Sequence, residues 1–195
     1  MRGSQLARVL MLDADGVLVH PAPNFARNEA LEGVVEAVRA AISPSQREAL
    51  GTGHADMLDV LRVVGGGPVE EIAAYWLARD THIDPAMLAA VDALRRGGTR
   101  VYLATNQDSR RAEYLWSTLG LVDHFDGLLA SSLLGVRKPD AAYFDAAAAT
   151  AGVIAADLVF IDDSEPNITA ARQAGWRAAH WTSDLTLEAA IAAAH

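Results

Sequence analysis

Two aspartates separated by one residue follow a short apolar run near the start of the chain, in the segment Asp13-Ala14-Asp15-Gly16. The preceding run, Val9-Leu10-Met11-Leu12, is rich in branched residues and is typical of a buried strand. Unpaired charge is costly to bury, so packing does not explain these acids. At the carboxyl end of a strand in an α/β sheet, they would face the crevice where ligands bind. The pattern indicates one acid as nucleophile or metal ligand and the other as proton carrier, with Gly16 allowing a tight turn.

Further polar residues follow other apolar runs in the same way. Thr105-Asn106 follows residues 100–104, Lys138-Pro139 follows residues 127–130 after a loop, and Asp162-Asp163 follows residues 158–161. Because the carboxyl ends of parallel strands share one edge of a sheet, we expect these groups to converge.

Together these residue types predict a site for phosphoryl transfer. A carboxylate nucleophile can accept a phosphoryl group and divide one difficult displacement into two easier ones. A hydroxyl and an ammonium group can bind the phosphate oxygens. Several carboxylates with no His or Cys nearby favour a hard, oxygen-binding ion, so Mg²⁺ rather than zinc. Such an ion offsets the repulsion between the attacking carboxylate and the phosphate.

The elements that must position these residues alternate regularly over most of the chain. Strand-like runs at residues 8–12, 100–104, 127–130, 158–161 and 177–181 predict five strands. Helical segments with capping residues and prolines at their starts lie between them, and they begin near Asp84-Pro85, Asp108 or Ser109, Pro139-Asp140, Glu165-Pro166 and Asp184. This alternation predicts an α/β fold with a mostly parallel five-stranded sheet and helices on both faces.

Residues 19–84 interrupt this alternation of strands and helices. They carry helical patterns at about 25–41, 45–50, 54–64 and 68–79, and they show no convincing strand. An all-helical stretch after the first strand is interpreted as a small lid over the strand ends. We therefore expect a core domain formed by residues 1–18 and 85–195 and a helical cap domain formed by residues 19–84. Tyr75 and Trp76 in the cap are interpreted as packing residues.

At these residues the chain resembles the haloacid dehalogenase (HAD) superfamily, and its phosphatase branch in particular. The resemblance is carried, in the family's order, by Asp13-Ala14-Asp15-Gly16-Val17, Thr105-Asn106, Lys138-Pro139 and residues 160–167. Val17 is a departure, because threonine is commoner at that position in the family. The resemblance implies a Rossmann-like three-layer core with an α-helical cap of the C1 type inserted after the first strand.

The resemblance also implies a role for each matching residue. Asp13 would be the nucleophile and a metal ligand. Asp15 would protonate the leaving oxygen and then activate water, while its backbone carbonyl binds Mg²⁺. Asp163 would be the main metal ligand of the acidic motif, and Asp162 would bind the metal directly or through water. The groups expected at the substrate phosphate are Thr105, Lys138 and, nearby, Asn106.

We therefore expect a Mg²⁺-dependent phosphatase that hydrolyses a small phosphorylated metabolite through an aspartyl-phosphate. A phosphomutase would use the same residues and differ only in the acceptor. A dehalogenase would need neither the second acid nor Mg²⁺, so Asp15 argues against it. Alternatives from another class are a phosphorylation-switch module like a response-regulator receiver and a family member that only binds a partner. A receiver would need no helical insert, and the complete set of catalytic residue types argues against a mere binding module.

The composition bears on partners and location. The chain has 195 residues, a net charge of −9 and no cysteine, which excludes disulfides, thiolate catalysis and zinc–sulfur sites. The acidic balance argues against a nucleic-acid or anionic-membrane partner. No apolar run reaches membrane-spanning length, and the first residues make a poor signal peptide. We expect a cytoplasmic enzyme, monomeric or weakly homodimeric, whose partner is a small phosphorylated metabolite.

Overall fold

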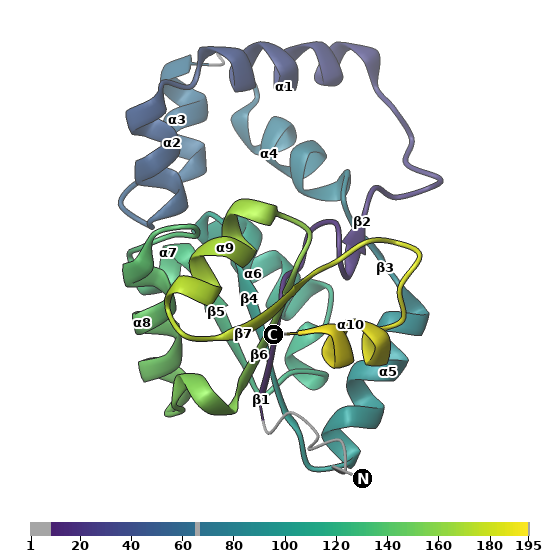
Figure 1. Ribbon diagram of the computed structural model, residues 1–195. Helices are drawn as coiled ribbons and strands as arrows, with labels where there is room; N and C mark the ends of the chain where they lie inside the picture. The colour runs from purple at the N-terminus through teal and green to yellow at the C-terminus, as the bar shows by residue number, and fades with distance from the viewer. Residues whose placement is uncertain (1–8, 65–66, 195) are drawn as a thin grey trace, which may run out of the picture.

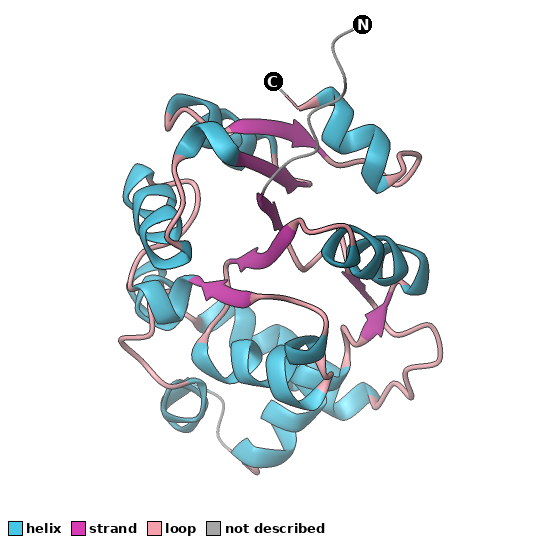
Figure 2. Ribbon diagram, turned by 90° about the horizontal axis from the view of Figure 1, so that it is seen from below, coloured by secondary structure: helices cyan, strands magenta, loops and turns pink. Residues whose placement is uncertain are grey.

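The computed structural model describes residues 9–64 and 67–194. Its centre is a five-stranded sheet in the order β5-β4-β1-β6-β7, in which every neighbouring pair is parallel. The strands are β1 (Val9–Leu12), β4 (Arg100–Thr105), β5 (Gly127–Ala130), β6 (Leu158–Asp162) and β7 (Arg177–His180). Helices lie on both faces of this sheet (Figures 1 and 2). The predicted α/β fold with a mostly parallel five-stranded sheet is confirmed.

Side chains alternate across the sheet and build two separate apolar layers. In the central strand β1, Leu10 and Leu12 enter one layer, and Val9 and Met11 enter the other. The first layer is covered by α5 (Pro85–Arg96), the π-helix η1 (Tyr114–Thr118) and α10 (Leu187–Ala193). The second layer is covered by α8 (Ala141–Ala151) and α9 (Glu165–Gln173). The result is a three-layer core in which the end of β1 lies at the middle of the sheet edge.

Local sequence signals set several helix starts. The predicted starts at Asp84 and Asp108 are confirmed, because each side chain accepts two backbone N–H groups at the start of α5 and of α6 (Ser109–Glu113). The last helix, expected from about Asp184, begins later, after the N-cap Thr186. The short elements η2 (Leu121–Asp123), α7 (Ser131–Leu134) and η3 (Ala155–Asp157) complete this part of the chain.

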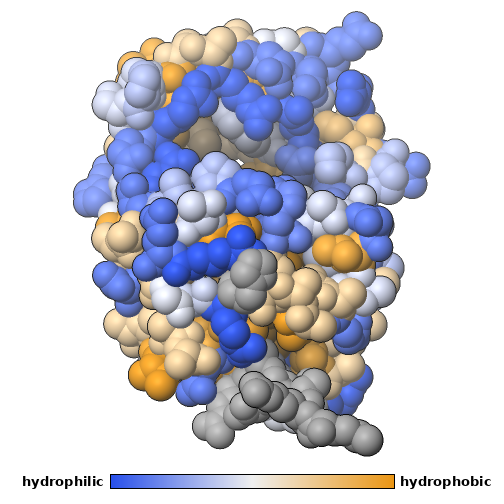
Figure 3. Space-filling model, in the orientation of Figure 1, coloured by the Kyte–Doolittle hydropathy of each residue, from blue (hydrophilic) through white to orange (hydrophobic). Residues whose placement is uncertain are grey.

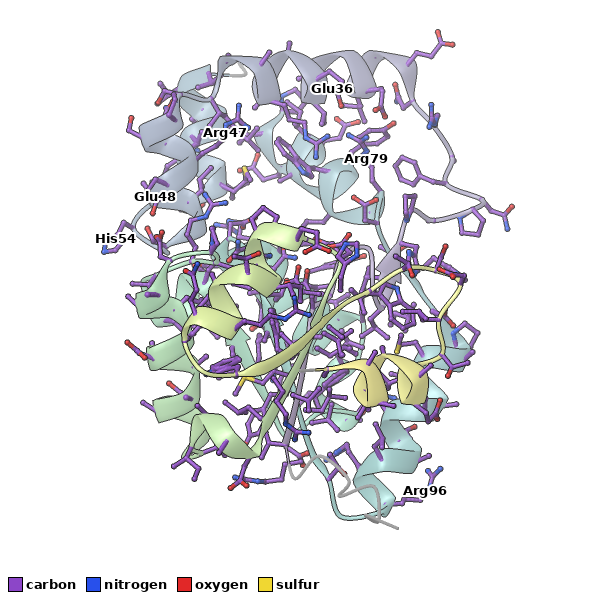
Figure 4. All side chains as sticks on the ribbon, in the orientation of Figure 1. Glu36, Arg47, Glu48, His54, Arg79 and Arg96 are labelled. Carbon is purple, nitrogen blue, oxygen red and sulfur yellow. The ribbon has the colours of Figure 1, made fainter. Side chains whose placement is uncertain are left out.

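Four helices form a group at one end of the molecule, above the sheet in Figure 1: α1 (Glu29–Ala41), α2 (Pro44–Gly51), α3 (Met57–Val64) and α4 (Val69–Ala78). They bury an apolar cluster of their own, which includes Val35, Leu61 and Ile72. Arg79 and Glu36 lie close together beside α4 and α1 (Figure 4), and their ion pair measures 3.3 Å. No helix in the described ranges combines the length and hydrophobicity of a membrane span.

Charged side chains connect this helical group to the rest of the protein. Asp56 forms an ion pair with Arg110 of α6 at 2.9 Å, and Glu48 forms one with Arg137 at 3.5 Å. Glu48 lies at the end of the group nearest the sheet (Figure 4). Hydrophilic residues predominate over the helical group on the face shown in Figure 3.

The expectation that residues 19–84 hold no strand is wrong at both ends of that range. β2 (Val19–His20) pairs antiparallel with β3 (His82–Ile83). Strands of two residues are too short for an alternating pattern to reveal them. The pair lies where the chain leaves the core and where it returns from α4. The division into a core and a cap at residues 18–19 and 84–85 stays a prediction, with its boundaries beside this pair.

Candidate active site

The segment that follows β1 carries two aspartates at the edge of the sheet, and they differ in how deeply they are buried. The Asp13 N–H donates to the Ile161 carbonyl of β6 at 3.0 Å, which continues the strand ladder by one residue. The chain then turns tightly, and the Leu18 N–H donates to the Ala14 carbonyl at 2.8 Å. Asp13 is therefore buried, with 8% of the residue exposed, whereas the Asp15 side chain is 53% exposed at the rim.

Lys138 lies at the centre of the buried polar cluster. Its Nζ is 3.0 Å from Asp13 Oδ1 and 2.5 Å from Asp162 Oδ2, and it donates to the Ala104 carbonyl at 2.8 Å. Only 1% of this residue is exposed. An ammonium group has three N–H donors, so all of them are engaged. Lys138 offsets part of the negative charge of two buried carboxylates, and binding a phosphate oxygen would require it to exchange one of these bonds.

The Asp162 carboxylate is fully buried and fully hydrogen-bonded. Its Oδ1 accepts from the Ser164 N–H at 2.8 Å, and both of its oxygens accept from Asn167 Nδ2 at 3.0 Å. With Lys138 bound to Oδ2 as well, the contacts hold Asp162 as an anchor for the ammonium group. Whether it also binds a metal directly stays a prediction.

Three carboxylates form a cluster that could hold a metal ion. Asp13, Asp162 and Asp163 each offer one oxygen, and these oxygens lie within 4.8 Å of one another. The Asp163 carboxylate lies directly over Gly16, whose φ of +79° is in the left-handed region. Carboxylate oxygens are the donors that hard divalent cations prefer. Asp15 was expected to contribute only its backbone carbonyl, and its carboxylate is turned to other partners, described below.

Burial and charge shift the pKa values in this cluster. Burial raises the pKa of Asp13 to about 6, although the Lys138 charge acts in the opposite direction. Burial by itself lowers the pKa of Lys138, but the charges of Asp13 and Asp162 outweigh it and the pKa is raised. Burial, followed by the Asp162 charge, raises the pKa of Asp163. A cation bound among these acids would favour their charged forms.

Thr105 and Asn106 follow β4 beside this cluster. Thr105 is buried, and its hydroxyl accepts a hydrogen bond from Gln107 Nε2 at 3.1 Å. The Asn106 side chain forms two bonds with the backbone of Lys138, donating to its carbonyl and accepting from its N–H, both at 2.9 Å. The Asn106 contacts therefore position Lys138, and any contact of Asn106 with phosphate stays a prediction.

The Asp15 carboxylate is held by residues that the sequence analysis did not identify. Gln107 Nε2 donates to Asp15 Oδ2 at 2.7 Å, and Arg111 Nη2 lies 3.4 Å from Asp15 Oδ1. A cavity of about 170 Å³ opens beside these groups. Its lining includes Asp15, Gln107, Arg110 and Arg111 from one side and Arg39 and Trp76 from helices α1 and α4.

The family follows from a comparison of the sequence with known protein families. A sequence model of the haloacid dehalogenase-like hydrolases matches residues 7–175. The chain belongs to this family. Among curated HAD relatives, a phosphoglycolate phosphatase of Cereibacter sphaeroides is 32% identical over 191 residues, which cover 89% of this chain and 84% of the relative. The sesquiterpene phosphatase astK of Aspergillus oryzae is 32% identical over 128 residues, 62% of each chain.

Solved structures of HAD proteins share the fold. A HAD family enzyme from Bacteroides thetaiotaomicron, in complex with magnesium and inorganic phosphate, superposes with a TM-score of 0.71 at 19% identity over 92% of this chain and 96% of that one. An L-2-haloacid dehalogenase from Xanthobacter autotrophicus gives a TM-score of 0.57 at 18% identity over 94% of this chain and 80% of that one. These likenesses show the shared fold, and the family model confirms the predicted membership of the HAD superfamily.

Most of the predicted HAD residues converge at one edge of the sheet. Asp13, Lys138, Asp162 and Asp163 meet there from three separate segments of the chain. Gln107 and Arg111 were not predicted, and Asn167 stood in the matching motif without an assigned role. Gln107 stands directly after Thr105-Asn106, so its position at the end of a strand could have identified it as a site residue. Arg111 lies inside a helix, where the sequence gives no indication of a role in the site. Trp76, which was interpreted as a packing residue, packs against the apolar cluster of helices α1 to α4. It also lines the cavity.

Replacing Gly16 by alanine is expected to disturb the acidic cluster that could hold a metal ion. A Cβ at this position would lie 2.1 Å from Asp163 Oδ2, so the carboxylate would have to move away from Gly16 and from its place in the acidic cluster. We expect the Mg²⁺ concentration for half-maximal activity to rise by roughly tenfold or more, the scale seen when groups that orient metal ligands are removed. Titrating Mg²⁺ against the initial rate measures this change.

Gly120→Ala is the matched control for backbone strain. Gly120 has a φ of +76°, close to that of Gly16, but a Cβ there would meet nothing within 4 Å. Both variants lose stability through the strained backbone, by about 1–2 kcal/mol. Only Gly16→Ala is expected to change the Mg²⁺ requirement. The same change in Gly120→Ala would show that the effect comes from strain and not from contact with Asp163.

Proposed function

We propose that this chain is a Mg²⁺-dependent phosphatase of small phosphomonoesters that carries the phosphoryl group on Asp13. The observation that supports this most strongly is the placement of Lys138, whose Nζ lies 3.0 Å from Asp13 Oδ1 at the edge where Asp163 also lies. A carboxylate nucleophile, a fixed cation and a further acid together form the minimum set for phosphoryl transfer.

The acidic cluster fits a magnesium ion. Asp13, Asp163 and the backbone carbonyl of Asp15 would hold it, with Asp162 in direct contact or one water away. When bound, the ion would supply positive charge that offsets the repulsion between the Asp13 carboxylate and an incoming phosphate.

In the first step, an oxygen of the Asp13 carboxylate attacks phosphorus and the bond from phosphorus to the leaving oxygen breaks. Lys138 and the Thr105 hydroxyl bind the phosphate oxygens, while Asn106 and Asp162 hold Lys138 in place. Asp15, in its protonated form, gives its proton to the leaving oxygen, so an alcohol departs. Its position at the rim of the cavity is suited to this transfer.

In the second step, water attacks the phosphorus of the aspartyl-phosphate. Asp15, now ionised, takes a proton from that water, and the bond between phosphorus and the Asp13 oxygen breaks. Inorganic phosphate leaves and both aspartates return to their starting forms. A phosphomutase would follow the same course with a sugar hydroxyl in place of water, and product analysis separates the two reactions.

The cavity favours a small leaving group. Its volume of about 170 Å³ is below the roughly 300–1,000 Å³ typical of pockets for drug-sized ligands. Arg39, Arg110 and Arg111 are among its lining residues, and the positive charge of arginine favours an anionic group such as a carboxylate. A short phosphorylated acid such as phosphoglycolate, which appears in the names of the relatives that match most of the chain, is our first candidate.

The testing experiment is a panel of phosphomonoesters assayed with and without Mg²⁺. We expect 2-phosphoglycolate and other short phosphates to release inorganic phosphate only with the ion, and a long prenyl phosphate to be hydrolysed much more slowly. A short 2-haloacid should release no halide. Halide release, or phosphate release unchanged by chelation of Mg²⁺, would contradict the proposal. The cytoplasmic location, the lack of a nucleic-acid or membrane partner and the monomeric or weakly dimeric state remain predictions from composition.

Magnesium is also expected to raise the melting temperature, and more so at higher pH. Without the ion, the raised pKa of Asp13, about 6 against 3.8, makes the folded state hold the proton more tightly than the unfolded state. Stability of the metal-free protein therefore falls as the pH rises from about 4 to about 6. Because metal binding requires ionised acids, the Mg²⁺-induced shift should be larger at about pH 8 than at about pH 5.

Differential scanning fluorimetry with and without Mg²⁺ measures this shift and needs no substrate. Asp163→Asn should remove most of it, whereas Asp145→Asn, an exposed acid in α8, should leave it unchanged. An equal shift in wild type and Asp163→Asn would place the bound ion elsewhere.

A further inference from the structure

Arg111 joins Asp15 to the segment that returns from the helical group. This residue of α6 is only 8% exposed. Its Nη1 donates to the Leu77 carbonyl at 3.1 Å, and its Nη2 donates to the Asp80 carbonyl at 2.5 Å. The same Nη2 lies 3.4 Å from Asp15 Oδ1. One guanidinium group therefore holds two backbone carbonyls and one carboxylate.

Both carbonyls belong to the return path from α4 to the core. Leu77 lies in the last turn of α4, and Asp80 lies between α4 and β3. This segment is one of the two connections between the helical group and the core, so a shift of the helices relative to the sheet would also move the two acceptors of Arg111. The guanidinium group is thus bound to a stretch of chain whose position depends on that of the helices.

The other oxygen of the Asp15 carboxylate is tied to the core. Gln107 Nε2 donates to Asp15 Oδ2 at 2.7 Å and to the Thr105 hydroxyl at the end of β4 at 3.1 Å. The Gln107 backbone N–H is itself held by the Ser131 hydroxyl at 3.0 Å. The Asp15 carboxylate therefore accepts from Gln107, which is held to the sheet, and from Arg111, which is held to the return segment.

We propose that Arg111 is a positioning residue that ties the orientation of the Asp15 carboxylate to the position of the return segment of the helical group. The inference rests on the proposed function, in which Asp15 gives its proton to the leaving oxygen. In the observed position of the helices, both Asp15 oxygens have donors, and Asp15 lines the cavity. Displacing Leu77 and Asp80 withdraws Arg111 and leaves Asp15 held by Gln107 alone.

An arginine suits this task because its planar group presents five N–H donors in a fixed fork. Lysine carries the same charge but has a compact ammonium group and cannot reach acceptors on both sides of that fork. Arg111→Lys therefore separates the charge from the geometry, and Arg111→Gln removes the charge and most of the donors.

The test compares a poor leaving group with a good one. p-Nitrophenolate is a far weaker base than an alkoxide, so its departure needs little proton donation, whereas an alkyl phosphate depends on the acid. We expect Arg111→Gln to lower kcat/KM for β-glycerol phosphate by at least about tenfold more than for p-nitrophenyl phosphate. Arg111→Lys should show the same selective loss, because the fork geometry is missing. A purely structural defect would lower the rates of both substrates by one common factor.

Two further variants identify the cause. Glu48→Gln breaks a different ion pair between the helical group and the core, formed with Arg137. This variant should leave the ratio of kcat/KM for the two substrates unchanged. Asp15→Asn should show the selective loss by itself, and adding Arg111→Gln to it should cause little further selective loss, because the two residues act as one unit.

Each outcome bears on a separate claim. If Asp15→Asn shows no selective loss, the proton-transfer role of Asp15 in the proposed function is wrong. If Asp15→Asn shows it but Arg111→Gln and Arg111→Lys lower both substrates equally, the proposed function stands and the positioning role of Arg111 is overturned. A full additional loss from Arg111→Gln in the Asp15→Asn background also overturns it.

Discussion

Asp13→Asn is expected to lower kcat by at least about 10⁴-fold, the scale seen when a catalytic nucleophile is removed. The amide has nearly the shape of the carboxylate, and its oxygen can still accept from Lys138 Nζ, which lies 3.0 Å away in the wild type. What it lacks is a nucleophilic oxygen able to form the acyl phosphate. Steady-state rates with Mg²⁺ measure the loss, and acid quenching with radiolabelled substrate should trap phosphate on the wild type only.

Loss of turnover in Asp13→Asn should come without loss of the fold. Burial raises the pKa of Asp13, so the ionised group is disfavoured where it lies, and the neutral amide should leave the metal-free protein at least as stable. Asp145→Asn makes the same chemical change at an exposed position and should retain full activity. Turnover within about tenfold of wild type in Asp13→Asn would remove the covalent step from the proposed mechanism.

Lys138→Met is expected to destabilise the protein by about 3–5 kcal/mol, the cost of leaving buried charge without its partner. The ammonium group touches both Asp13 and Asp162, and the site is almost closed to water. Methionine fills a similar volume but carries no positive charge to offset that of the two carboxylates. Activity should fall as well, because no cation remains for the phosphate. Urea unfolding of the metal-free protein measures the change in stability.

The double variant Lys138→Met with Asp162→Asn separates these two effects. Removing the Asp162 charge takes away much of the repulsion with Asp13. The free energy of unfolding should therefore return most of the way to the wild-type value, while activity stays low. If Lys138→Met alone unfolds at the wild-type urea concentration, the pair is not acting as a buried ion pair. If the double variant regains activity, Lys138 has no direct part in the chemistry.

Much of the fold could be predicted because its signals are local. Val9-Leu10-Met11-Leu12 reads as a buried strand from composition alone, and Asp84 and Asp108 cap helices through bonds to residues two and three positions away. The pair β2–β3 escaped prediction because two residues per strand carry no periodicity, and the pairing joins Val19 to Ile83. Such a contact depends on how the helices between them fold back.

The order of the reactive groups was likewise set by the sequence. Asp13, Thr105 and Asp162 stand where apolar runs end, Lys138 follows its run after a further segment, and parallel strands bring those ends to one edge. Only the tertiary structure decided which group each one meets. Lys138 bonds to Asp162 across 24 residues, and Asn106 bonds to the Lys138 backbone across 32. Arg111 reaches Asp15 across 96, from inside a helix that carries no motif. Strand ends and helix caps follow from short-range preferences, but the partner of a buried charge is chosen by packing, because every such group needs a neighbour that local sequence does not supply.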